Sequence, residues 1–446
     1  MAGEWAEVAL SELTDPETPI TYGVVKPGLL DPDGVLFIRG GDIADGRVLT
    51  KQLRTITKGI SHQYRRTLLR GGEIVVSLVG NPGQIAIVPE SLHGANIARQ
   101  VGLVRLKSNV DTRFVKYYLS SPKGQEALGA QSSGSVQQVI NLGDLKTVRV
   151  PTPPLSEQRA IARILGALDD KIELNRRMNE TLEAMARALF KSWFIDFDPV
   201  HAKAEGHDPS LPADIAALFP NSFEDSGLGE IPKGWELDTF GALLSLAKGL
   251  SYKGEFLSDT GVPMVNLGCF PGQGRFKREA MKRYLGGYQE RHTVKPGDLV
   301  LANTDITQRR EVIGSPGIVP QVAGSHELIF THHVYAARFR GGKQQWKPYV
   351  FFYLLSDQFR QRATGFATGT TVLALPREAI TDCQFPEPPD MLIQAFNRLV
   401  APFQELSWQV EEQSISLTAL RDTLLPRLLS GDLRVKDVDQ SMEAHQ

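Results

Sequence analysis

Basic side chains are the residues of this sequence best suited to chemistry, and the chemistry they suit is the neutralisation of phosphate. Two basic runs stand out, at residues 58–70 (KGISHQYRRTLLR) and 275–284 (RFKREAMKRY). Lys and Arg in such runs bind nucleic-acid phosphates, although a solvated surface can have the same composition. The candidate phosphate-binding residues are Lys58, Arg65, Arg66, Lys277, Arg278, Lys282, Arg309 and Arg310.

Two small polar loops, at 132–138 and 368–371, could recognise bases. Amide and hydroxyl side chains hydrogen-bond to base edges in the grooves of DNA. Ser- and Gly-rich segments are also ordinary connections, so this interpretation competes with a plain loop. The candidate base-reading residues are Ser132, Ser133, Ser135, Gln137, Thr370 and Thr371.

No motif for catalysis, a metal or a cofactor occurs in the sequence. It has no NPPY or DPPY methyltransferase motif, no GxxxxGKS or GxxxxGKT phosphate loop and no HExxH. Cys269 and Cys383 belong to no Cys/His cluster, and we expect both to be buried as small apolar side chains. The sequence therefore predicts a binding protein with no catalytic residue, no metal and no cofactor of its own.

The sequence also indicates the cellular compartment of the protein. The opening MAGEWAEVAL is acidic and lacks an apolar core, so it does not read as a signal peptide. No run of about 18 apolar residues predicts a membrane span. With only two cysteines, these features predict a cytoplasmic protein that has no contact with a membrane.

Charge is distributed unevenly along the 446 residues, whose net charge is −2. Residues 1–150 contain 17 Lys and Arg against 14 Asp and Glu, and residues 231–390 contain 19 against 15. Residues 151–230 contain 8 against 14, and residues 391–446 contain 5 against 8. Two basic regions thus alternate with two acidic ones, a pattern that favours a polyanion bound by the basic regions alone.

The element that positions the basic regions is a long helix predicted over residues 156–194. Ser156 stands as an N-cap after three prolines, and no proline follows until Pro199. Apolar residues then recur at alternating intervals of four and three, the repeat of a coiled coil, although an ordinary amphipathic helix is the alternative. This seam comprises Ile161, Leu165, Leu168, Ile172, Asn175, Asn179, Leu182, Ala186, Leu189 and Trp193.

A second seam follows residue 391 and could pair with the first. Pro402 is expected to kink or split this helix, and Pro426 should mark its final turn. Both seams are polar near the middle, a feature that selects register in helical pairs. The second seam comprises Phe396, Leu399, Phe403, Leu406, Val410, Gln413, Leu417, Leu420, Leu424 and Leu428.

The second half of the chain repeats the first. The strand-turn-strand pattern that follows Glu73 returns after Asp298. Further along, Gly134 corresponds to Gly369, and Pro153 corresponds to Pro388 at the same spacing. These later pairs are spaced slightly more widely than Glu73 and Asp298. A duplicated chain with one insertion between the matched blocks explains the difference.

Together these patterns predict an α+β protein with two similar globular α/β domains. An antiparallel coiled coil of two long helices separates them, and an approximate two-fold axis relates the two halves. The predicted domains are 1–150 (globular), 151–195 (helical), 196–230 (acidic Pro/Gly linker), 231–390 (globular), 391–432 (helical) and 433–446 (tail).

Several segments of the chain resemble those of a known family. The segments PPLSEQRAIARILGALDDKI, LRGGEIVVSLVGNPG and TYGVVKPG, with the duplicated layout, resemble the specificity subunit of type I restriction-modification enzymes over nearly the whole chain. The second copy, EPPDMLIQAF, lacks the SEQ triplet and corresponds mainly by its place in the repeat.

The resemblance implies two target recognition domains, each of which reads one half of a bipartite, asymmetric site in double-stranded DNA. The helices would set the spacing between half-sites and dock two methyltransferase subunits, through which restriction subunits join. S-adenosylmethionine, ATP and magnesium would then be bound by those partners. The alternative is a coiled-coil scaffold without DNA specificity, whose apolar interfaces would respond less to salt.

Overall fold

The computed structural model describes residues 5–129, 139–272, 274–306, 310–325, 327–369 and 372–435. The chain forms two compact units: unit 1 is residues 1–177 with 410–446, and unit 2 is residues 178–409. Each unit combines sheets with one segment of each of two long helices, α6 (Leu155–Phe194) and α13 (Asp390–Ser430). The α+β class is confirmed, and the compact units divide the two predicted helical regions between them.

Unit 1 contains short strands and helices that precede α6. In chain order they are β1 (Glu7–Ala9), α1 (Leu10–Leu13), β2 (Thr21–Tyr22), β3 (Val35–Ile38), β4 (Ile43–Ala44), β5 (Arg47–Val48), β6 (Arg54–Ile56), α2 (Lys58–Gln63), β7 (Ile74–Ser77), β8 (Ile85–Ile87), β9 (Asn96–Ile97), β10 (Val101–Val104), α3 (Thr112–Ser120), α4 (Pro122–Ala127), α5 (Leu142–Thr147) and β11 (Arg149–Pro151).

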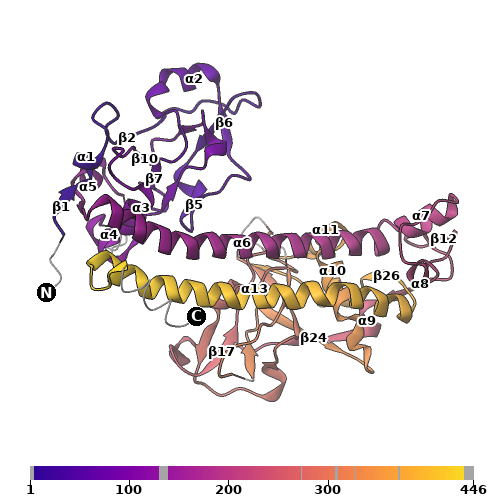
Figure 1. Ribbon diagram of the computed structural model, residues 1–446. Coiled ribbons are helices and arrows are strands. Elements are labelled where there is room, and N and C mark those ends of the chain that lie inside the picture. The colour runs from indigo at the N-terminus through magenta and orange to yellow at the C-terminus, as the bar shows by residue number, and fades with distance from the viewer. Residues whose placement is uncertain are drawn as a thin grey trace. The chain divides into compact units, whose positions relative to one another are not determined.

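A four-stranded sheet in the order β2-β10-β7-β8 forms the centre of unit 1. All four residues of β7 are buried, because alternate side chains enter two different cores. Ile74 and Val76 pack with α3 and the helix segments, whereas Val75 packs with residues of a smaller sheet, β6-β3-β9. The small sheet thus lies on one face of the central sheet, and the helices cover the other (Figure 1).

Unit 2 contains the corresponding elements and an additional segment before them. In chain order they are α7 (Asp198–Ala204), α8 (Ala213–Ala216), β12 (Phe223–Ser226), β13 (Gly229–Pro232), β14 (Glu236–Thr239), α9 (Phe240–Leu243), β15 (Leu244–Lys248), β16 (Leu257–Ser258), β17 (Val262–Val265), β18 (Lys282–Tyr284), β19 (Thr293–Val294), β20 (Leu299–Ala302), β21 (Thr304–Asp305), β22 (Pro316–Ile318), β23 (Leu328–Phe330), β24 (Val334–Phe339), α10 (Lys347–Leu354), α11 (Asp357–Phe366), β25 (Leu373–Ala374), α12 (Glu378–Thr381) and β26 (Gln384–Glu387).

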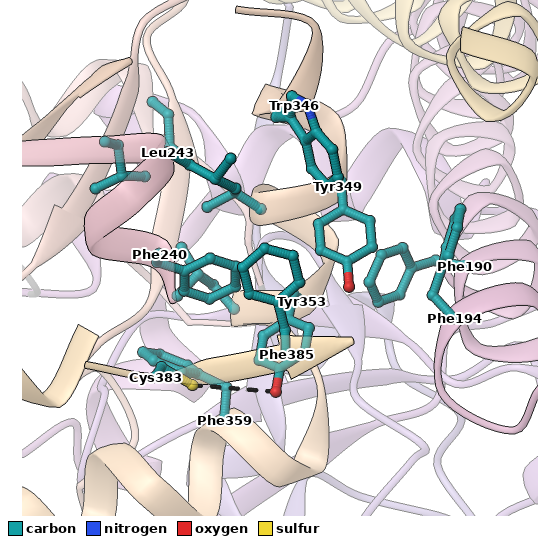
Figure 2. Packing of buried hydrophobic residues seen from close by; sticks show 14 of the residues in the cluster. Phe190, Phe194, Phe240, Leu243, Trp346, Tyr349, Tyr353, Phe359, Cys383 and Phe385 are labelled. Atoms are coloured by element: carbon teal, nitrogen blue, oxygen red, sulfur yellow. Dashed lines mark hydrogen bonds between the residues drawn. The ribbon is translucent and has the colours of Figure 1, made fainter. Parts of the chain in front are cut away.

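An aromatic core joins the sheet and helices of unit 2. Phe190 and Phe194 of α6 pack against Tyr349 of α10, with ring centroids 5.3 and 5.1 Å away (Figure 2). Trp346 and Phe385 continue the cluster, and both are fully buried. Rings of this size bury large areas and favour such edge-to-face contacts. The end of α6 is therefore part of the core of unit 2.

The predicted repeat is confirmed by topology. The sheet order β15-β24-β20-β22 of unit 2 matches β2-β10-β7-β8, and a small sheet, β16-β18-β17-β23-β19, matches β6-β3-β9. Strands β7 and β20 begin directly after Glu73 and Asp298, the two residues that the sequence repeat aligns. The starts of α3 and α10, of β11 and β26, and of α6 and α13 all have the same spacing as Pro153 and Pro388, as predicted.

The two long helices pair within each unit. In unit 1 Asn175 lies against Val410 and Gln413, and Asp169 against Arg421, so α6 and α13 run antiparallel there. In unit 2 the ring of Phe190 contacts that of Phe396. Two of the three predicted polar seam residues meet, because Asn175 Nδ2 donates to Gln413 Oε1 over 2.9 Å.

The predicted seams are buried unequally. All ten positions of the α6 seam are buried or partly buried, as are Phe396, Phe403, Val410, Leu417 and Leu424 of α13. Leu399, Leu406 and Leu420 are 37–48% exposed, so their assignment to the second seam is wrong. Gln413 is also exposed, whereas Leu428 is fully buried. One position per heptad of α13 is therefore buried or partly buried along the seam, and the other leaves Leu399, Leu406 and Leu420 open to solvent.

Three local predictions about the helical and linker segments also differ from the structure. Helix α6 begins at Leu155, so Ser156 lies inside its first turn and is not the N-cap. Pro402 does not split α13, which is continuous, because this proline lies on an exposed face where its missing N–H is tolerated. Segment 196–230 was predicted as a linker with one short helix around residues 213–219, where α8 is found. It also contains α7 and the β12–β13 hairpin, and it contributes Val200 and Phe219 to the core of unit 2.

Candidate nucleic-acid interface

Helix α2 presents Lys58 on the small sheet of unit 1. Thr57 caps the helix, because its hydroxyl oxygen accepts a hydrogen bond from the Ile60 backbone N–H over 3.3 Å. Ile60 and Tyr64 pack on the buried side chains of β3 and β6. Lys58 is exposed in the first turn of this helix, which directly follows β6 in the chain.

A short 3-10 turn, Arg65–Thr67, exposes the two predicted arginines of unit 1. Thr67 anchors the turn, because its buried hydroxyl donates to Asn96 Oδ1 over 2.6 Å. The guanidinium groups of Arg65 and Arg66 have no hydrogen-bond or ion-pair partner within the described ranges. Both are therefore available to an anion.

The predicted cations of unit 2 are more varied. Lys277 is exposed but lies 3.9 Å from the carboxylate of Glu279. Arg310 donates to the backbone oxygen of Thr364 over 3.0 Å, and Arg278 is partly buried. Lys282 is exposed on β18. Of these residues, Lys282 has the surroundings that best suit an anionic ligand.

The remaining predicted residues fall outside the described ranges. They are Ser132, Ser133, Ser135, Gln137, Arg309, Thr370 and Thr371.

The strand register shows which residues of the two units occupy equivalent places. The backbone N–H of Val24 donates to the oxygen of Ile97, and that of Leu250 donates to the oxygen of Phe330, both over 2.8 Å. Ile97 pairs with β3 as Phe330 pairs with β17. Val24 and Leu250 are therefore equivalent, and residues near them correspond one to one.

A glycine precedes each of these residues and fixes the approach of the chain. A Cβ atom on Gly23 would lie 1.8 Å from the oxygen of Ile97, and one on Gly249 would lie 2.3 Å from the oxygen of Thr331. No side chain fits at such distances from a backbone atom. The segments after the two glycines are thereby held against the small sheets.

Four exposed residues of unit 1 around this segment were not predicted from the sequence. Tyr22 is 39% exposed, and Lys26, Arg54 and Arg99 are exposed cations with no carboxylate partner in the part of the chain that the structure describes. They lie far apart in the sequence, so no basic run marks them. The alignment of Gly23 with Gly249 is the signal that could have found them.

The equivalent residues of unit 2 form a connected group. Lys282 Nζ donates to the hydroxyl oxygen of Tyr252 over 3.2 Å and lies 5.5 Å from the centre of its ring. Lys248 is exposed at the end of β15. The buried Nδ1 of His332 has no hydrogen-bond partner among the described residues.

His333 extends this group. Its Nδ1 lies 2.9 Å from the hydroxyl oxygen of Thr304, and its ring centroid is 3.8 Å from that of His332. Burial and then the adjacent His332 ring lower the pKa of His333, and the nearby Lys248 and Lys282 ammonium groups lower it further. The ring is therefore neutral at pH 7 and can donate or accept a hydrogen bond.

An equivalent ion pair occurs at the four-stranded sheet of each unit. In unit 1 Arg105 Nε lies 3.2 Å from the carboxylate of Glu73, and in unit 2 Arg338 Nη1 lies 3.1 Å from that of Asp298. Arg105 also donates to the backbone oxygens of Arg66 and Leu68 over 3.0 and 2.6 Å. The Arg65–Thr67 turn is thus tied to the central sheet, which explains why an acid recurs at both positions of the repeat.

Ionic contacts also tie the globular part of unit 1 to its helix segments. Asp169 of α6 accepts hydrogen bonds from Lys116 and Tyr117 of α3 and from Arg421 of α13, at 2.8–3.1 Å. Burial acts to raise the pKa of Asp169, but these three partners outweigh it and lower the pKa. The Arg176 hydrogen bond lowers the pKa of Glu173, one turn further along, to about 2.

In unit 2 part of the predicted basic run serves the same purpose. Arg275 Nη2 lies 3.1 Å from Glu180 of α6, and its Nε lies 3.8 Å from Glu183. Arg275 therefore attaches the globular part to the helix, and it is not free for a ligand.

The described residues form neither a metal site nor a disulfide. Within the described ranges no group of three or more His, Cys, Asp or Glu side chains could hold a metal ion. Cys269 and Cys383 are buried and unpaired, as predicted, and burial raises the pKa of the Cys269 thiol to about 11. No described helix is both long and apolar enough to cross a lipid bilayer.

The comparisons with known proteins agree with this architecture. Residues 5–184 match the family model described as the type I restriction modification DNA specificity domain. The matched segment lies in the first half of the chain, and the relatives to which the chain is similar over most of its length are specificity subunits of type I restriction-modification enzymes.

Named relatives extend the match beyond residue 184. The type I restriction enzyme EcoBI specificity subunit of Escherichia coli is 37% identical over 196 residues, which are 42% of this chain and 41% of that protein. The MjaIX specificity subunit of Methanocaldococcus jannaschii is 27% identical over 74% of this chain and 71% of its own. The HindI specificity subunit of Haemophilus influenzae is 24% identical over 90% of this chain and 94% of its own.

A solved structure shares the fold. The S subunit of a type I restriction-modification system from M. genitalium matches with a TM-score of 0.52 at 17% identity, and the match covers 95% of this chain and 96% of that one.

Proposed function

We propose that this chain is the subunit through which a type I restriction-modification enzyme recognises its DNA sequence. Each unit reads one half of a bipartite, asymmetric target in double-stranded DNA. Methylation and cleavage are carried out by other subunits, which bind S-adenosylmethionine, ATP and magnesium. The complex acts in the cytoplasm, where its DNA is found.

One observation carries the proposal: the same fold occurs twice, with different side chains at equivalent places. In both units, cations and aromatic rings on the small sheet and on the segments that flank it lie wholly or partly in solvent, as on DNA-binding surfaces. In unit 1 these side chains are Tyr22, Lys26, Arg54 and Arg99, whereas unit 2 has Lys248, Tyr252, Lys282 and His332. Two copies of one reader with different side chains suit a target whose two halves differ in sequence.

Exposed cations supply affinity, and polar side chains supply discrimination. Each phosphate that a Lys or Arg neutralises releases counterions, so binding weakens steeply as salt rises. Each good bidentate contact with a base contributes about 1–3 kcal/mol of discrimination. Lys58, Arg65 and Arg66 of unit 1 have the exposure that phosphate contact requires.

The long helices serve as spacer and as docking surface in this proposal. Both pass through both units, so their length fixes how much chain separates the two readers. Exposed apolar side chains on α13 are suited to a protein partner, and we assign them to two methyltransferase subunits, through which restriction subunits join. They are Leu399, Leu406 and Trp408 in unit 2 and Ile415 and Leu420 in unit 1.

A helix insertion tests the spacer role. Seven residues, one heptad, would be inserted into α6 between Arg177 and Met178 and into α13 between Gln409 and Val410, where unit 1 meets unit 2 in sequence. One heptad adds about 10.5 Å of helix and preserves the seam. Methylation mapping should then show a gap longer by about three base pairs, at about 3.4 Å each, with both half-sites unchanged.

The matched control places seven residues in the exposed loop around Gly206, outside both long helices. Copurification with the methyltransferase subunits shows that each variant still assembles. An assembled helix variant that methylates the original gap length would refute the spacer role.

A further inference from the structure

The equivalence of the two readers separates side chains that hold the DNA backbone from side chains that read bases. This inference rests on the proposed function and extends it to individual residues. Phosphates are the same along all DNA, so a phosphate contact keeps the same chemistry in both copies of a repeated reader. A base contact changes whenever the two half-sites differ.

The strand register pairs Arg54 with Lys282. Arg54 lies opposite Phe37 on β3, and Lys282 lies opposite Met264 on β17. Phe37 and Met264 are themselves equivalent, because each is the residue through which its strand begins the parallel pairing with β9 or β23. This position holds an exposed cation in both units.

Three other positions hold different chemistry in the two units. The residue before the closely packed glycine, Gly23 or Gly249, is Tyr22 in unit 1 and Lys248 in unit 2. The residue three places after that glycine is Lys26 or Tyr252. The third position is defined by a backbone hydrogen bond of 2.9 Å. In unit 1 the N–H of Arg99 donates to the oxygen of Val24, and in unit 2 the N–H of His332 donates to the oxygen of Leu250.

In unit 2, a direct contact and nearby charges link these positions. Lys282 touches Tyr252 directly, and both Lys248 and Lys282 lower the pKa of His333, the neighbour of His332. The Nδ1 of His332 is buried without a partner among the described residues, which leaves one polar atom unused. Stacking, cationic and imidazole groups that converge in this way are those that recognise base edges and faces.

We propose that Tyr22, Lys26 and Arg99 determine the half-site read by unit 1, that Lys248, Tyr252 and His332 determine the half-site read by unit 2, and that Arg54 and Lys282 hold the phosphate backbone. The reading residues differ between the units because the half-sites differ. The holding residues are alike because the backbone is uniform.

The test uses the full chain assembled with its methyltransferase subunits, and it measures binding to duplexes in which each half-site base pair is replaced in turn. Tyr22→Ala, Lys26→Ala and Arg99→Ala should each reduce discrimination about tenfold or more at a base pair of one half-site, and leave the other half-site unchanged. Lys248→Ala, Tyr252→Ala and His332→Ala should do the same at the opposite half-site.

The two holding positions should respond differently. Arg54→Ala and Lys282→Ala should weaken binding to all duplexes alike and reduce the slope of log affinity against log salt by about one each. Arg54→Lys should keep most of the affinity that Arg54→Ala loses, because a phosphate contact depends more on the positive charge than on the planar guanidinium group. Lys146→Ala and Lys233→Ala, exposed lysines on α5 and after β13, are the matched controls and should change neither discrimination nor half-site preference.

The outcomes separate this inference from the function on which it rests. If the unaltered complex shows no bipartite preference, the proposed function fails. If it keeps that preference while the six reading variants discriminate as well as the unaltered chain, only this inference fails. Reading variants that weaken binding uniformly, without relaxing either half-site, would make these residues phosphate contacts and would also overturn it.

Discussion

Replacement of Arg105 by methionine should destabilise unit 1 by about 3–5 kcal/mol, the usual cost of removing one member of a buried ion pair. The side chains of Arg105 and Glu73 are 9% and 6% exposed, so water cannot replace the lost partner. The change would leave the Glu73 carboxylate and two backbone oxygens, those of Arg66 and Leu68, without the guanidinium. Methionine fills a similar volume, so the loss reports charge and hydrogen bonding rather than a cavity.

The repeat supplies a matched comparison. Arg338 and Asp298 of unit 2 form the equivalent pair, but their side chains are 36% and 31% exposed. Solvent screens such a pair, and Arg338→Met should cost about 1 kcal/mol or less. Two chemically identical substitutions in one chain are thus expected to differ at least threefold in their effect on the free energy of unfolding.

Hydrogen exchange measured on peptides resolves the two units in one sample. Arg105→Met should speed exchange in β7 and β10, and Arg338→Met should have a small effect on β20 and β24. Adding Glu73→Gln to Arg105→Met should recover part of the loss, since it removes the stranded charge. Equal effects of the two arginine substitutions, or a loss below about 1 kcal/mol for Arg105→Met, would refute the assigned role of burial.

Two further predictions concern the helix pair of unit 1. Asn175→Leu should stabilise the helix pair by about 1–2 kcal/mol in chemical denaturation, because the buried Asn175 Oδ1 has no partner among the described residues. A loss of stability would show that the Asn175–Gln413 hydrogen bond outweighs the cost of burying this unpaired oxygen. Because the pKa values of Asp169 and Glu173 are lowered on folding, their stabilisation should be complete above about pH 4.5 and should fade as the pH drops toward about 2. The double variant Asp169→Asn, Glu173→Gln should flatten this acid dependence in unfolding measured from pH 6 to pH 2, and an unchanged profile would mean that other carboxylates control it.

Much of the fold could be predicted because its signals are periodic. The spacing seen first between Pro153 and Pro388 recurs between the starts of α6 and α13. A predicted helix of residues 156–194 is observed as Leu155–Phe194. Long helices and duplicated strand patterns repeat the same information many times, so a local error does not remove them.

Local features were harder to predict because single residues decide them. Pro402 is accommodated on an exposed face, and whether a seam residue such as Leu406 meets its partner depends on the packing of the facing helix. Gln158 shows how context assigns roles: it is buried in unit 1, where it accepts a hydrogen bond from the Asp111 backbone N–H. The equivalent residue of unit 2 is the apolar Ile393, which is buried in the core of that unit.

The candidate interface was predicted in part. The basic runs contain Lys58, Arg65, Arg66 and Lys282, which are exposed, but they also contain Arg275, which is bound to the acids of α6. Sequence alone could not show that Arg275 is satisfied, since its partners lie far away along the chain. The residues around Gly23 and Gly249 were missed for the opposite reason, because strand pairing brings them together from distant positions.

The central role proposed for this chain is to supply the DNA sequence preference of its enzyme. Single-molecule sequencing of methylated bases, in cells with the methyltransferase subunits and with or without this chain, measures that role directly. The account predicts one bipartite motif of two unlike half-sites separated by a fixed gap, present only when the chain is present. Methylation of the same motif in its absence, or a single uninterrupted motif in its presence, would contradict the account.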